Sequence, residues 1–266
     1  RLAVNLQTYE ENKNFDSLRL YGELITANIY ALSKGMDKAT VVNYYSDAGE
    51  SAEIPLSVDK TPQQNAQAYF KKYNKARTAF QYAEKELEIL KSEASYLESV
   101  IFAIENAEGP GQLAEIRLEL AEQGYLKPAG KKGGKRAKSR KVQAVQVLPL
   151  RLTSKDGFEI LIGRNNKEND KLTLKTARHE DIWFHVKNFP GSHVVIRTEG
   201  RDVPASTLVE AAQYAAWFSK ARSAPKAEVD YTAVRNVKKP SGAKPGMVIY
   251  VNYNTLSVAP KEPEKD

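Results

Sequence analysis

The sequence of 266 residues contains no cysteine, and this absence excludes several kinds of structure and site. Without thiols the chain can form no disulfide and offers no thiolate to a zinc ion. Such a composition favours a reducing compartment. Long apolar runs are also lacking, so the sequence predicts no membrane insertion.

Histidine is scarce, and all three copies lie close together at His179, His185 and His193. A metal site would need further ligands, but no cysteine exists and the nearby acids do not face both rings. Ser192 and His193 are adjacent, and adjacent residues of a strand point to opposite faces, so they do not form a nucleophile and base pair. We therefore predict no catalytic residue, no metal, no cofactor and no enzymatic activity.

Positive charge is concentrated in one segment, residues 127–141, KPAGKKGGKRAKSRK. It holds eight of the chain's 40 basic residues and none of its 33 acidic ones, so the remaining charge nearly balances. The glycines prevent a packed core there, which predicts a flexible linker. Two interpretations stay open: a solvated linker, or a tether that binds a polyanion. In the second, the contacts come from Lys131, Lys132, Lys135, Arg136, Lys138, Arg140 and Lys141.

The clearest pattern lies between Thr61 and Ala107, where apolar residues recur at alternating spacings of three and four. This is typical of a coiled-coil seam. Thr61 and Gln64 predict a capping box at its start, and a helix of this length would span roughly 70 Å. The seam residues are Tyr69, Tyr73, Ala76, Phe80, Ala83, Leu87, Leu90, Ala94, Leu97, Ile101 and Ile104.

Shorter elements surround this helix. A helix over residues 15–33 has the same alternation and is its natural antiparallel partner. Residues 39–56 predict a β-hairpin with its turn at 47–49, and residues 112–123 predict a short helix with Leu113, Ile116 and Leu120 on one face.

The remainder predicts a head of mixed structure. Strands are expected at 142–152, 159–163, 227–234 and 247–251, and a helix at 207–222 with a Thr207/Glu210 capping box. We therefore expect an α+β chain, with a long antiparallel coiled-coil arm and small β-hairpin followed by a mixed α/β head. The expected divisions are the arm at 1–126, the basic linker at 127–141, the head at 142–260 and a polar tail at 261–266.

Within the head, residues 182–197 predict a hairpin whose turn is Asn188 to Ser192. In that register Lys187 faces His193, His185 faces Val195 and Trp183 faces Arg197. One face is then uniformly apolar, and the other gathers Trp183, His185, Lys187, His193 and Arg197. An aromatic plane, imidazoles and cations on one sheet face can stack bases and contact phosphates. The alternative is a second packed face with polar tips at its margin.

Two predicted loops extend this candidate RNA-binding surface. GRNNKEND, residues 163–170, supplies Arg164 and Asn165, and KKPSGAKPG, residues 238–246, supplies Lys238, Lys239 and Lys244. Neither matches a phosphate-binding loop or a dinucleotide fingerprint.

DIWFHVKNFPGSHVVIR, GRNNKEND and DYTAVRNVKKPSGAKPG resemble the C-terminal NFACT-R domain of the RqcH, Rqc2 and NEMF family. LRLYGELITANIYALSKG and LAEIRLELAEQGYLKP, from the first half, resemble the coiled-coil middle domain of its bacterial branch, also called fibronectin-binding protein A. The family's N-terminal domain, which selects the tRNA, has no counterpart in the resemblance, so no residue of that site is assigned. The family residues carried over are Asp181, Trp183, His185, Pro190, Gly191, Ser192, His193, Lys239, Pro240, Gly242, Lys244, Pro245 and Gly246.

The resemblance implies a cytoplasmic role in ribosome-associated quality control. Such a factor binds the obstructed large ribosomal subunit through its rRNA and recruits tRNA, so that the stalled chain gains a C-terminal alanine tail. Peptidyl transfer would be the ribosome's own chemistry. The competing class is an adhesin at the cell surface, because bacterial relatives are described as binding fibronectin. One protein can have both roles, so this alternative stays open.

Overall fold

A computed structural model describes residues 1–46, 49–127 and 149–263, and these residues form two compact units. The first unit is residues 1–92 and the second is residues 93–266. Helix α3 (Pro62–Glu105) begins in the first unit and ends in the second. The contacts thus divide the chain inside α3, whereas the sequence-based division lies at the basic linker. The linker residues 128–141 and the expected strand residues 142–148 lie outside the described part.

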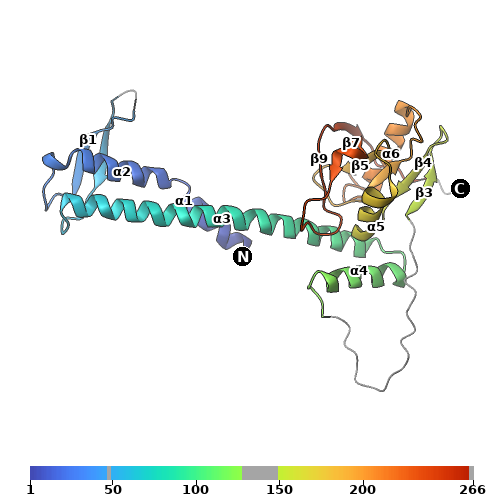
Figure 1. Ribbon diagram of the computed structural model, residues 1–266, viewed down its shortest axis with the longest axis horizontal. Helices are drawn as coiled ribbons and strands as arrows, with labels where there is room; N and C mark the ends of the chain where they lie inside the picture. Colours follow the sequence, from blue (N-terminus) through green and yellow to red (C-terminus); the bar gives the residue numbers. More distant parts are fainter. Residues whose placement is uncertain (47–48, 128–148, 264–266) are drawn as a thin grey trace, which may run out of the picture. The chain divides into compact units, whose positions relative to one another are not determined.

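The first unit is a helical hairpin with a small sheet at one end (Figure 1). Helices α1 (Leu2–Asn12) and α2 (Phe15–Ala27) are followed by the 3₁₀ turn η1 (Ile29–Ala31). Strands β1 (Lys38–Val42) and β2 (Ser51–Pro55) pair antiparallel, which confirms the predicted hairpin. The capping box of α3 is also confirmed: Thr61 N–H donates to Gln64 Oε1 at 2.9 Å, and Gln64 N–H donates to Thr61 Oγ1 at 3.3 Å.

Aromatic contacts hold α2 against α3. The rings of Phe15 and Phe80 are 5.3 Å apart, and those of Tyr21 and Tyr69 are 5.5 Å apart in an edge-to-face arrangement. Gly22 lets the two backbones approach, because a Cβ at this position would come within 2.9 Å of the Phe70 ring. The expected pairing of these two helices is confirmed, although α2 ends at Ala27 and not at Ser33.

The predicted seam is correct in the first half of α3 and wrong in the second. Tyr69, Ala83 and Leu87 are buried as expected. Farther along, Ile101 is 54% exposed and Ile104 is 44% exposed, while the buried residues are Tyr96, Val100 and Ala103. The buried stripe moves because this end of α3 packs against a different partner, helix α4 (Pro110–Glu122).

Between α3 and α4 the contact is partly polar. Tyr96 is fully buried and its hydroxyl donates to Glu119 Oε1 at 2.9 Å. Ile116 of α4 is buried as predicted, but Leu113 is 44% exposed, and the other buried residues of α4 are Gln112 and Glu119. Burial raises the pKa of Glu119, although hydrogen bonds from Asn166 and Tyr96 act in the opposite direction.

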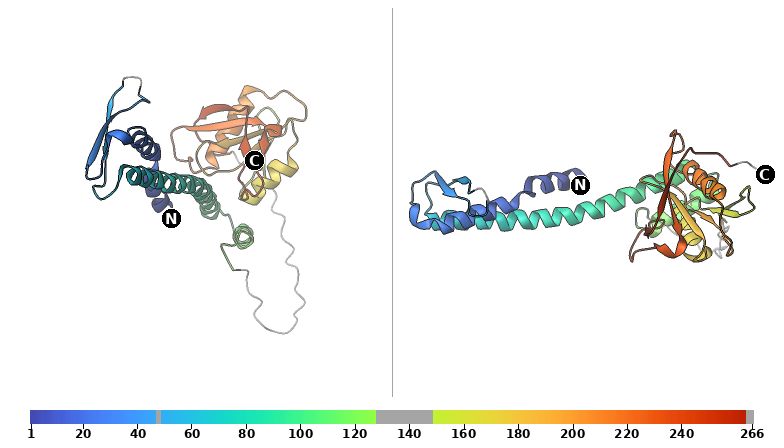
Figure 2. Two further views of the ribbon diagram at one scale, coloured as in Figure 1. Left: turned by 60° about the vertical axis from the view of Figure 1, so that its left-hand side comes forward. Right: turned by 90° about the horizontal axis from the view of Figure 1, so that it is seen from above.

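The head contains a six-stranded antiparallel sheet in the order β10-β7-β5-β6-β4-β3. Its strands are β3 (Leu150–Thr153), β4 (Glu159–Ile162), β5 (Ile182–Val186), β6 (Val194–Ile196), β7 (Ala227–Ala233) and β10 (Asn254–Val258). Helix α6 (Ala205–Trp217) packs on one side of this sheet. The other side carries α5 (Asn166–Lys171), the π-helix η2 (Leu172–Thr176), the 3₁₀ turn η3 (Val234–Asn236) and the hairpin β8 (Val237–Lys238) with β9 (Ile249–Tyr250). Figure 2 shows the sheet and α6 from two further sides.

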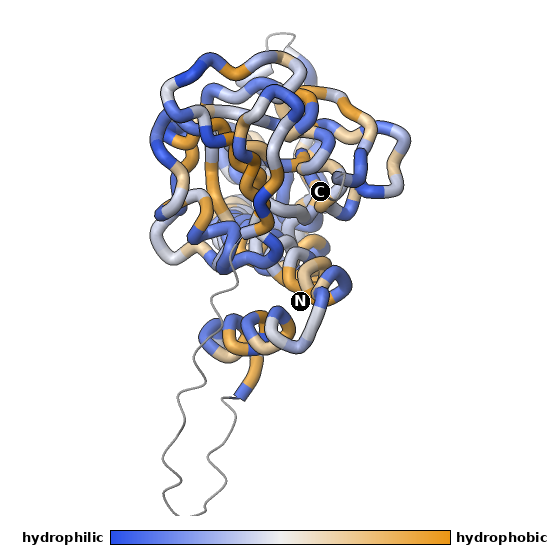
Figure 3. Tube along the Cα trace, turned by 90° about the vertical axis from the view of Figure 1, so that its right-hand side faces the viewer, coloured by the Kyte–Doolittle hydropathy of each residue, from blue (hydrophilic) through white to orange (hydrophobic). Residues whose placement is uncertain are grey.

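Two apolar clusters cover the two faces of this sheet. The larger lies under α6 and contains Phe184, Val194 and Ile196 together with the alanines of the helix. The smaller lies on the opposite face and joins Trp183 and Val195 to Leu172 of η2. Apolar stretches along the strands are visible between the polar loops in Figure 3. The α+β class is confirmed.

Two local expectations about the head are wrong, and one strand was not predicted. Residues 163–170 are not a loop, because Asn165 caps helix α5 by accepting the N–H of Glu168 at 2.9 Å. Thr207 does not cap α6, because its hydroxyl bonds Asp156 at 2.6 Å. Strand β10 follows from no signal that the sequence analysis used.

Candidate nucleic-acid interface

The predicted hairpin at 182–197 forms, with the predicted division of its two faces and a different register. Trp183 pairs with Val195 and Phe184 with Val194, two residues away from the expected pairing. An even shift leaves each side chain on its predicted face. The turn is longer than expected because its residues bond elsewhere: Lys187 N–H donates to Glu228 O, and Ser192 N–H donates to Phe218 O.

The expected exposed face of this hairpin is instead a second packed face. Trp183 is fully buried and His193 is 2% exposed. Their rings meet edge to face at 5.2 Å, and Trp183 also contacts Tyr250 of β9 at 4.8 Å. Trp183 and His193 therefore do not form an open platform for stacking bases, and that expectation is corrected.

The two cations predicted for the same face are neutralised by carboxylates. Arg197 Nε lies 2.9 Å from Asp181 Oδ2, and Asp181 is fully buried. Asp181 also accepts the N–H groups of Arg178 and Thr198, so it ties the start of β5 to the end of β6. Lys187 lies 3.8 Å from Glu228 on the neighbouring strand. Arg197 is therefore held within the structure of the sheet, whereas Lys187 forms a pair at the surface.

Most of the predicted loop residues are also engaged within the chain. Arg164 contacts Glu168, and Asn165 is buried and donates to Glu115 of α4. Lys239 pairs with Asp170. Lys244 lies over the rings of Tyr96 and Tyr125, 5.6 and 5.0 Å from their centroids. Lys238 is exposed, and the seven linker cations lie outside the described residues.

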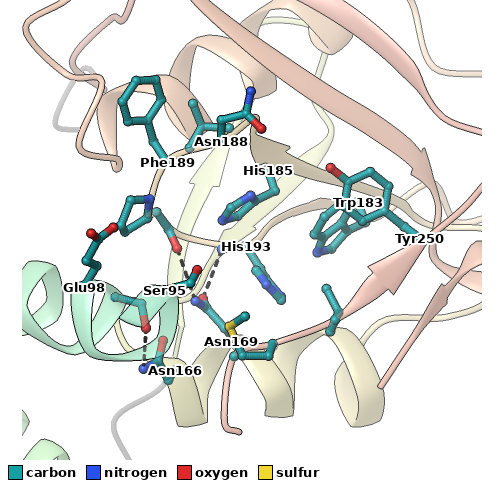
Figure 4. Close-up of a pocket in the computed structure, with 17 residues that line it drawn as sticks. Ser95, Glu98, Asn166, Asn169, Trp183, His185, Asn188, Phe189, His193 and Tyr250 are labelled. Carbon is teal, nitrogen blue, oxygen red and sulfur yellow. Dashed lines mark hydrogen bonds between the residues drawn. The ribbon is translucent and has the colours of Figure 1, made fainter. Parts of the chain in front are cut away.

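A pocket of about 270 Å³ lies where the predicted segments meet (Figure 4). Its walls come from the last turns of α3, from α5, from β5 and its turn, and from the segment that leads into β9. The lining residues are Ser95, Glu98, Ser99, Asn166, Asn169, Trp183, His185, Val186, Asn188, Phe189, Pro190, Gly191, His193, Gly246, Met247, Val248 and Tyr250. Residues of GRNNKEND, DIWFH, NFPGSH and KKPSGAKPG thus line one space.

Side-chain amides fix the shape of this pocket. Asn169 Oδ1 accepts the N–H of His193 at 3.0 Å, and Asn166 Nδ2 donates to Ser99 Oγ at 3.0 Å and to Glu119 Oε1 at 3.1 Å. Close glycines make this possible: a Cβ at Gly163 would lie 2.2 Å from Asn169 Oδ1. These amides connect α3, α4 and α5 to the sheet and are committed to structure.

Both pocket histidines are neutral at pH 7. Burial lowers the pKa of His185 to about 4, against the opposing influence of nearby backbone groups and Asp230. Burial, followed by the neighbouring His185, lowers the pKa of His193 well below its usual value. The two rings lie 5.6 Å apart, and His193 Nδ1 lies 2.7 Å from Thr173 Oγ1. Neutral imidazoles can donate and accept hydrogen bonds but attract no phosphate.

An exposed basic patch lies elsewhere on the head, and the sequence analysis missed most of it. We call it the outer patch: Lys171, Lys175, Arg178, Arg235 and Lys238. Arg235 N–H donates to His179 O, and Leu172, Val234 and Val237 share one cluster, so the two segments are neighbours. None of the five forms an ion pair with another described residue. Lys171 and Lys175 are four residues apart, a spacing that places two side chains on the same face of a helix, and this was the signal available in the sequence.

Among the residues that the structure describes, no group of three or more histidine, aspartate or glutamate side chains lies close enough to hold a metal ion. No helix in that part of the chain has the length and apolar character needed to cross a membrane.

Comparison with known proteins identifies related sequences for both parts of the chain. Residues 2–140 match the family description "NFACT N-terminal and middle domains", and residues 148–252 match "NFACT protein RNA binding domain". The chain is 43% identical over 256 residues to the Rqc2 homolog RqcH of Bacillus subtilis (strain 168), covering 96% of this chain and 43% of that protein. It is 39% identical to the RqcH of Streptococcus suis (strain 05ZYH33), covering 98% of this chain and 45% of that protein.

A solved structure is similar too. It is the C-terminal part of the fibronectin/fibrinogen-binding protein from Streptococcus suis, with a TM-score of 0.66, 34% identity and coverage of 98% of this chain and 90% of that one. The chain spans less than half the length of the two curated relatives named above. By its matches to both family descriptions and to these relatives, the chain belongs to the NFACT family, and its head corresponds to the family's RNA-binding domain.

Proposed function

We propose that this chain acts in ribosome-associated quality control, as a binding factor and not as an enzyme. Its proposed partners are the rRNA of an obstructed large ribosomal subunit and tRNA, and its proposed outcome is the alanine tailing of the stalled chain in the cytoplasm. The relatives named RqcH and the match to an RNA-binding domain support this role.

The outer patch is the observation that carries RNA binding. Residues 171–180 and 234–239 contain one acidic residue, Glu180, and five cations that no described carboxylate neutralises. Cations left free by the fold can displace counterions from a phosphate backbone, whereas paired cations cannot. The outer patch is therefore a better candidate for phosphate contact than Arg197, Lys187 or Lys239.

The test is a salt series of binding to large ribosomal subunits and to tRNA. Replacing Lys171, Lys175 and Lys238 by glutamine should weaken binding. It should also reduce the slope of the logarithm of the binding constant against the logarithm of salt concentration by about 2 to 3, because each phosphate contact contributes roughly 0.7 to 0.9. The matched control replaces Lys155, Lys220 and Lys226, which are also exposed and carry the same charge. Equal losses in both triple variants would contradict the proposal.

Fibronectin binding is the second candidate, favoured by one observation. The similar solved structure belongs to a protein named for binding fibronectin and fibrinogen. Immobilised fibronectin, measured beside the ribosomal subunits, separates the two candidates. Fibronectin binding that survives the outer-patch variant would assign that role to another surface.

A further inference from the structure

None of the outer-patch residues lines the pocket of the head, and the lining has a different chemistry. Among the described residues that line it there is no lysine and no arginine. Glu98 is the one acid in the lining, and it is exposed on α3. A phosphate would meet no cation in this lining and would be repelled by Glu98. The lining therefore disfavours a phosphate and is compatible with an uncharged group.

Flat rings form much of the wall. Among the rings that line it, His185 and Tyr250 keep exposed surface, and His185 stacks on the buried Trp183 with the centroids 5.8 Å apart (Figure 4). At the rim, Phe189 is 50% exposed on the turn after β5. A volume of about 270 Å³ is smaller than the roughly 300 to 1,000 Å³ of sites for drug-sized molecules, so it suits one small planar group.

Hydrogen-bonding capacity remains in this wall. The amides of Asn166 and Asn169 are committed to protein partners, but the indole N–H of Trp183 is buried without a hydrogen-bond partner in the described structure. Because Trp183 has no exposed surface, it cannot offer this donor to an occupant of the pocket, so the usable groups belong to the residues that keep exposed surface. Ser95 adds a hydroxyl and His185 an imidazole that carries no charge at neutral pH.

We propose that this pocket binds one unstacked nucleobase of a single-stranded RNA segment, with the base beside Phe189 and its polar edge toward the wall of His185 and Ser95. Single-stranded RNA is recognised by splayed bases that stack on aromatic or histidine rings and use their hydrogen-bonding edges. The inference rests on the proposed RNA binding and adds a base-reading site to the phosphate-contacting patch.

The experiment compares RNA with a chain of equal charge that lacks bases. Fluorescence anisotropy would measure binding of the whole protein to labelled decamers of adenylate, cytidylate and uridylate, and to an abasic ribose-phosphate decamer. At least one RNA decamer should bind about ten-fold more tightly than the abasic chain, in the range expected for one stacked base.

Two variants assign this preference to the pocket. Phe189→Ala removes the exposed ring at the rim, and Ser95→Phe fills the pocket from an exposed position of α3. Each should reduce the RNA-to-abasic ratio to less than about two-fold while affinity for the abasic chain stays unchanged. Tyr82→Ala, which removes an exposed ring from the first unit, is the control and should keep the ratio.

The outcomes separate this inference from the proposed function. Equal binding of RNA and abasic chains by the wild-type protein would overturn the base site and leave phosphate binding standing. A ten-fold preference that persists in both pocket variants would place base reading elsewhere and overturn it too. Binding of neither chain at low salt would overturn both. Affinity should also be constant from pH 6 to 8, because a site that used charged imidazoles for phosphate would bind more tightly toward pH 6.

Discussion

Individual side chains show that residue type alone does not identify a binding surface. Trp183, His193 and Arg197 have the chemistry that RNA recognition uses, yet two are buried and the third pairs with Asp181. A sequence identifies donors, rings and charges but not their partners within the fold. Asp181, Glu228 and Asp170 are the partners that neutralise three predicted cations, and each comes from a separate segment.

The pocket histidines predict a specific dependence of stability on pH. The folded pKa of His185 is about 4 and that of His193 is also lowered, so both bind protons more weakly folded than unfolded. Stability that is fully present above the unfolded value of about 6.5 is then lost as the pH falls toward 4. The loss is at most about 1.4 kcal/mol per pH unit for each histidine. Asp230 faces His185 and opposes this shift, whereas Lys239 reinforces it at His193.

Chemical denaturation at pH 7, 6 and 5 would measure this dependence. His193→Gln should flatten the decline of the unfolding free energy, whereas His179→Gln should not, because His179 is exposed. The difference between variants is the quantity to compare, since buried Glu119 and Glu168 have raised pKa values and contribute the opposite trend. Parallel declines in both variants would refute the assignment.

Among the elements, helix α3 shows how far a periodic pattern can be extended. The alternation of three and four is continuous from Tyr69 to Ile104, but the buried stripe follows it only in the part of α3 that packs with α1 and α2. Beyond Leu90 the partner is α4, and Tyr96, Val100 and Ala103 become the inner residues. Apolar residues occupy both stripes, so spacing could not decide between them.

Adjacent residues of α3 offer a direct test of this change. Val100 is 3% exposed and Ile101 is 54% exposed, although the sequence pattern places Ile101 in the seam. Val100→Ala should reduce the free energy of unfolding by about 2 kcal/mol, because it leaves a cavity against α4. Ile101→Ala should change it by no more than about 0.5 kcal/mol. Equal effects in thermal or urea denaturation would contradict the observed packing.

The hairpin at 182–197 shows the same limit for strands. The alternation of side chains along the strands predicted correctly which residues share a face of the sheet, because each face packs against its own apolar cluster. The register was missed because the turn residues bond to β7 and to the end of α6, which a local pattern cannot reveal. The cap at Asn165 was available in the sequence as Asn-x-x-Glu and was overlooked.

Considered as a whole, the chain has a head unit that begins inside α3. Asn166 bonds Ser99 of α3 and Glu119 of α4, and Asn165 bonds Glu115, so both helices complete the head. Without these helices, Met247 of the head would lose the cluster formed by Tyr96 and Ile116. The unit that is expected to fold is therefore residues 93–266, not the head alone.

Two fragments check this expectation. A fragment of residues 93–266 should unfold cooperatively, whereas a fragment of residues 149–266 should melt several degrees lower, because it exposes the faces that α3 and α4 cover. Calorimetry or circular dichroism would compare them. Equal melting temperatures would show that the two helices add nothing to the stability of the head.

The two tryptophans lie in different environments, so intrinsic tryptophan fluorescence can report on the pocket. Trp183 is enclosed in the pocket wall, whereas the Arg222 guanidinium lies 3.7 Å from the ring centroid of Trp217 on α6. Their emission should therefore differ in wavelength, with Trp183 contributing the bluer component. After Trp217→Phe, the remaining tryptophan emission comes from Trp183 alone, so an occupant of the pocket can be followed without a label attached to either molecule.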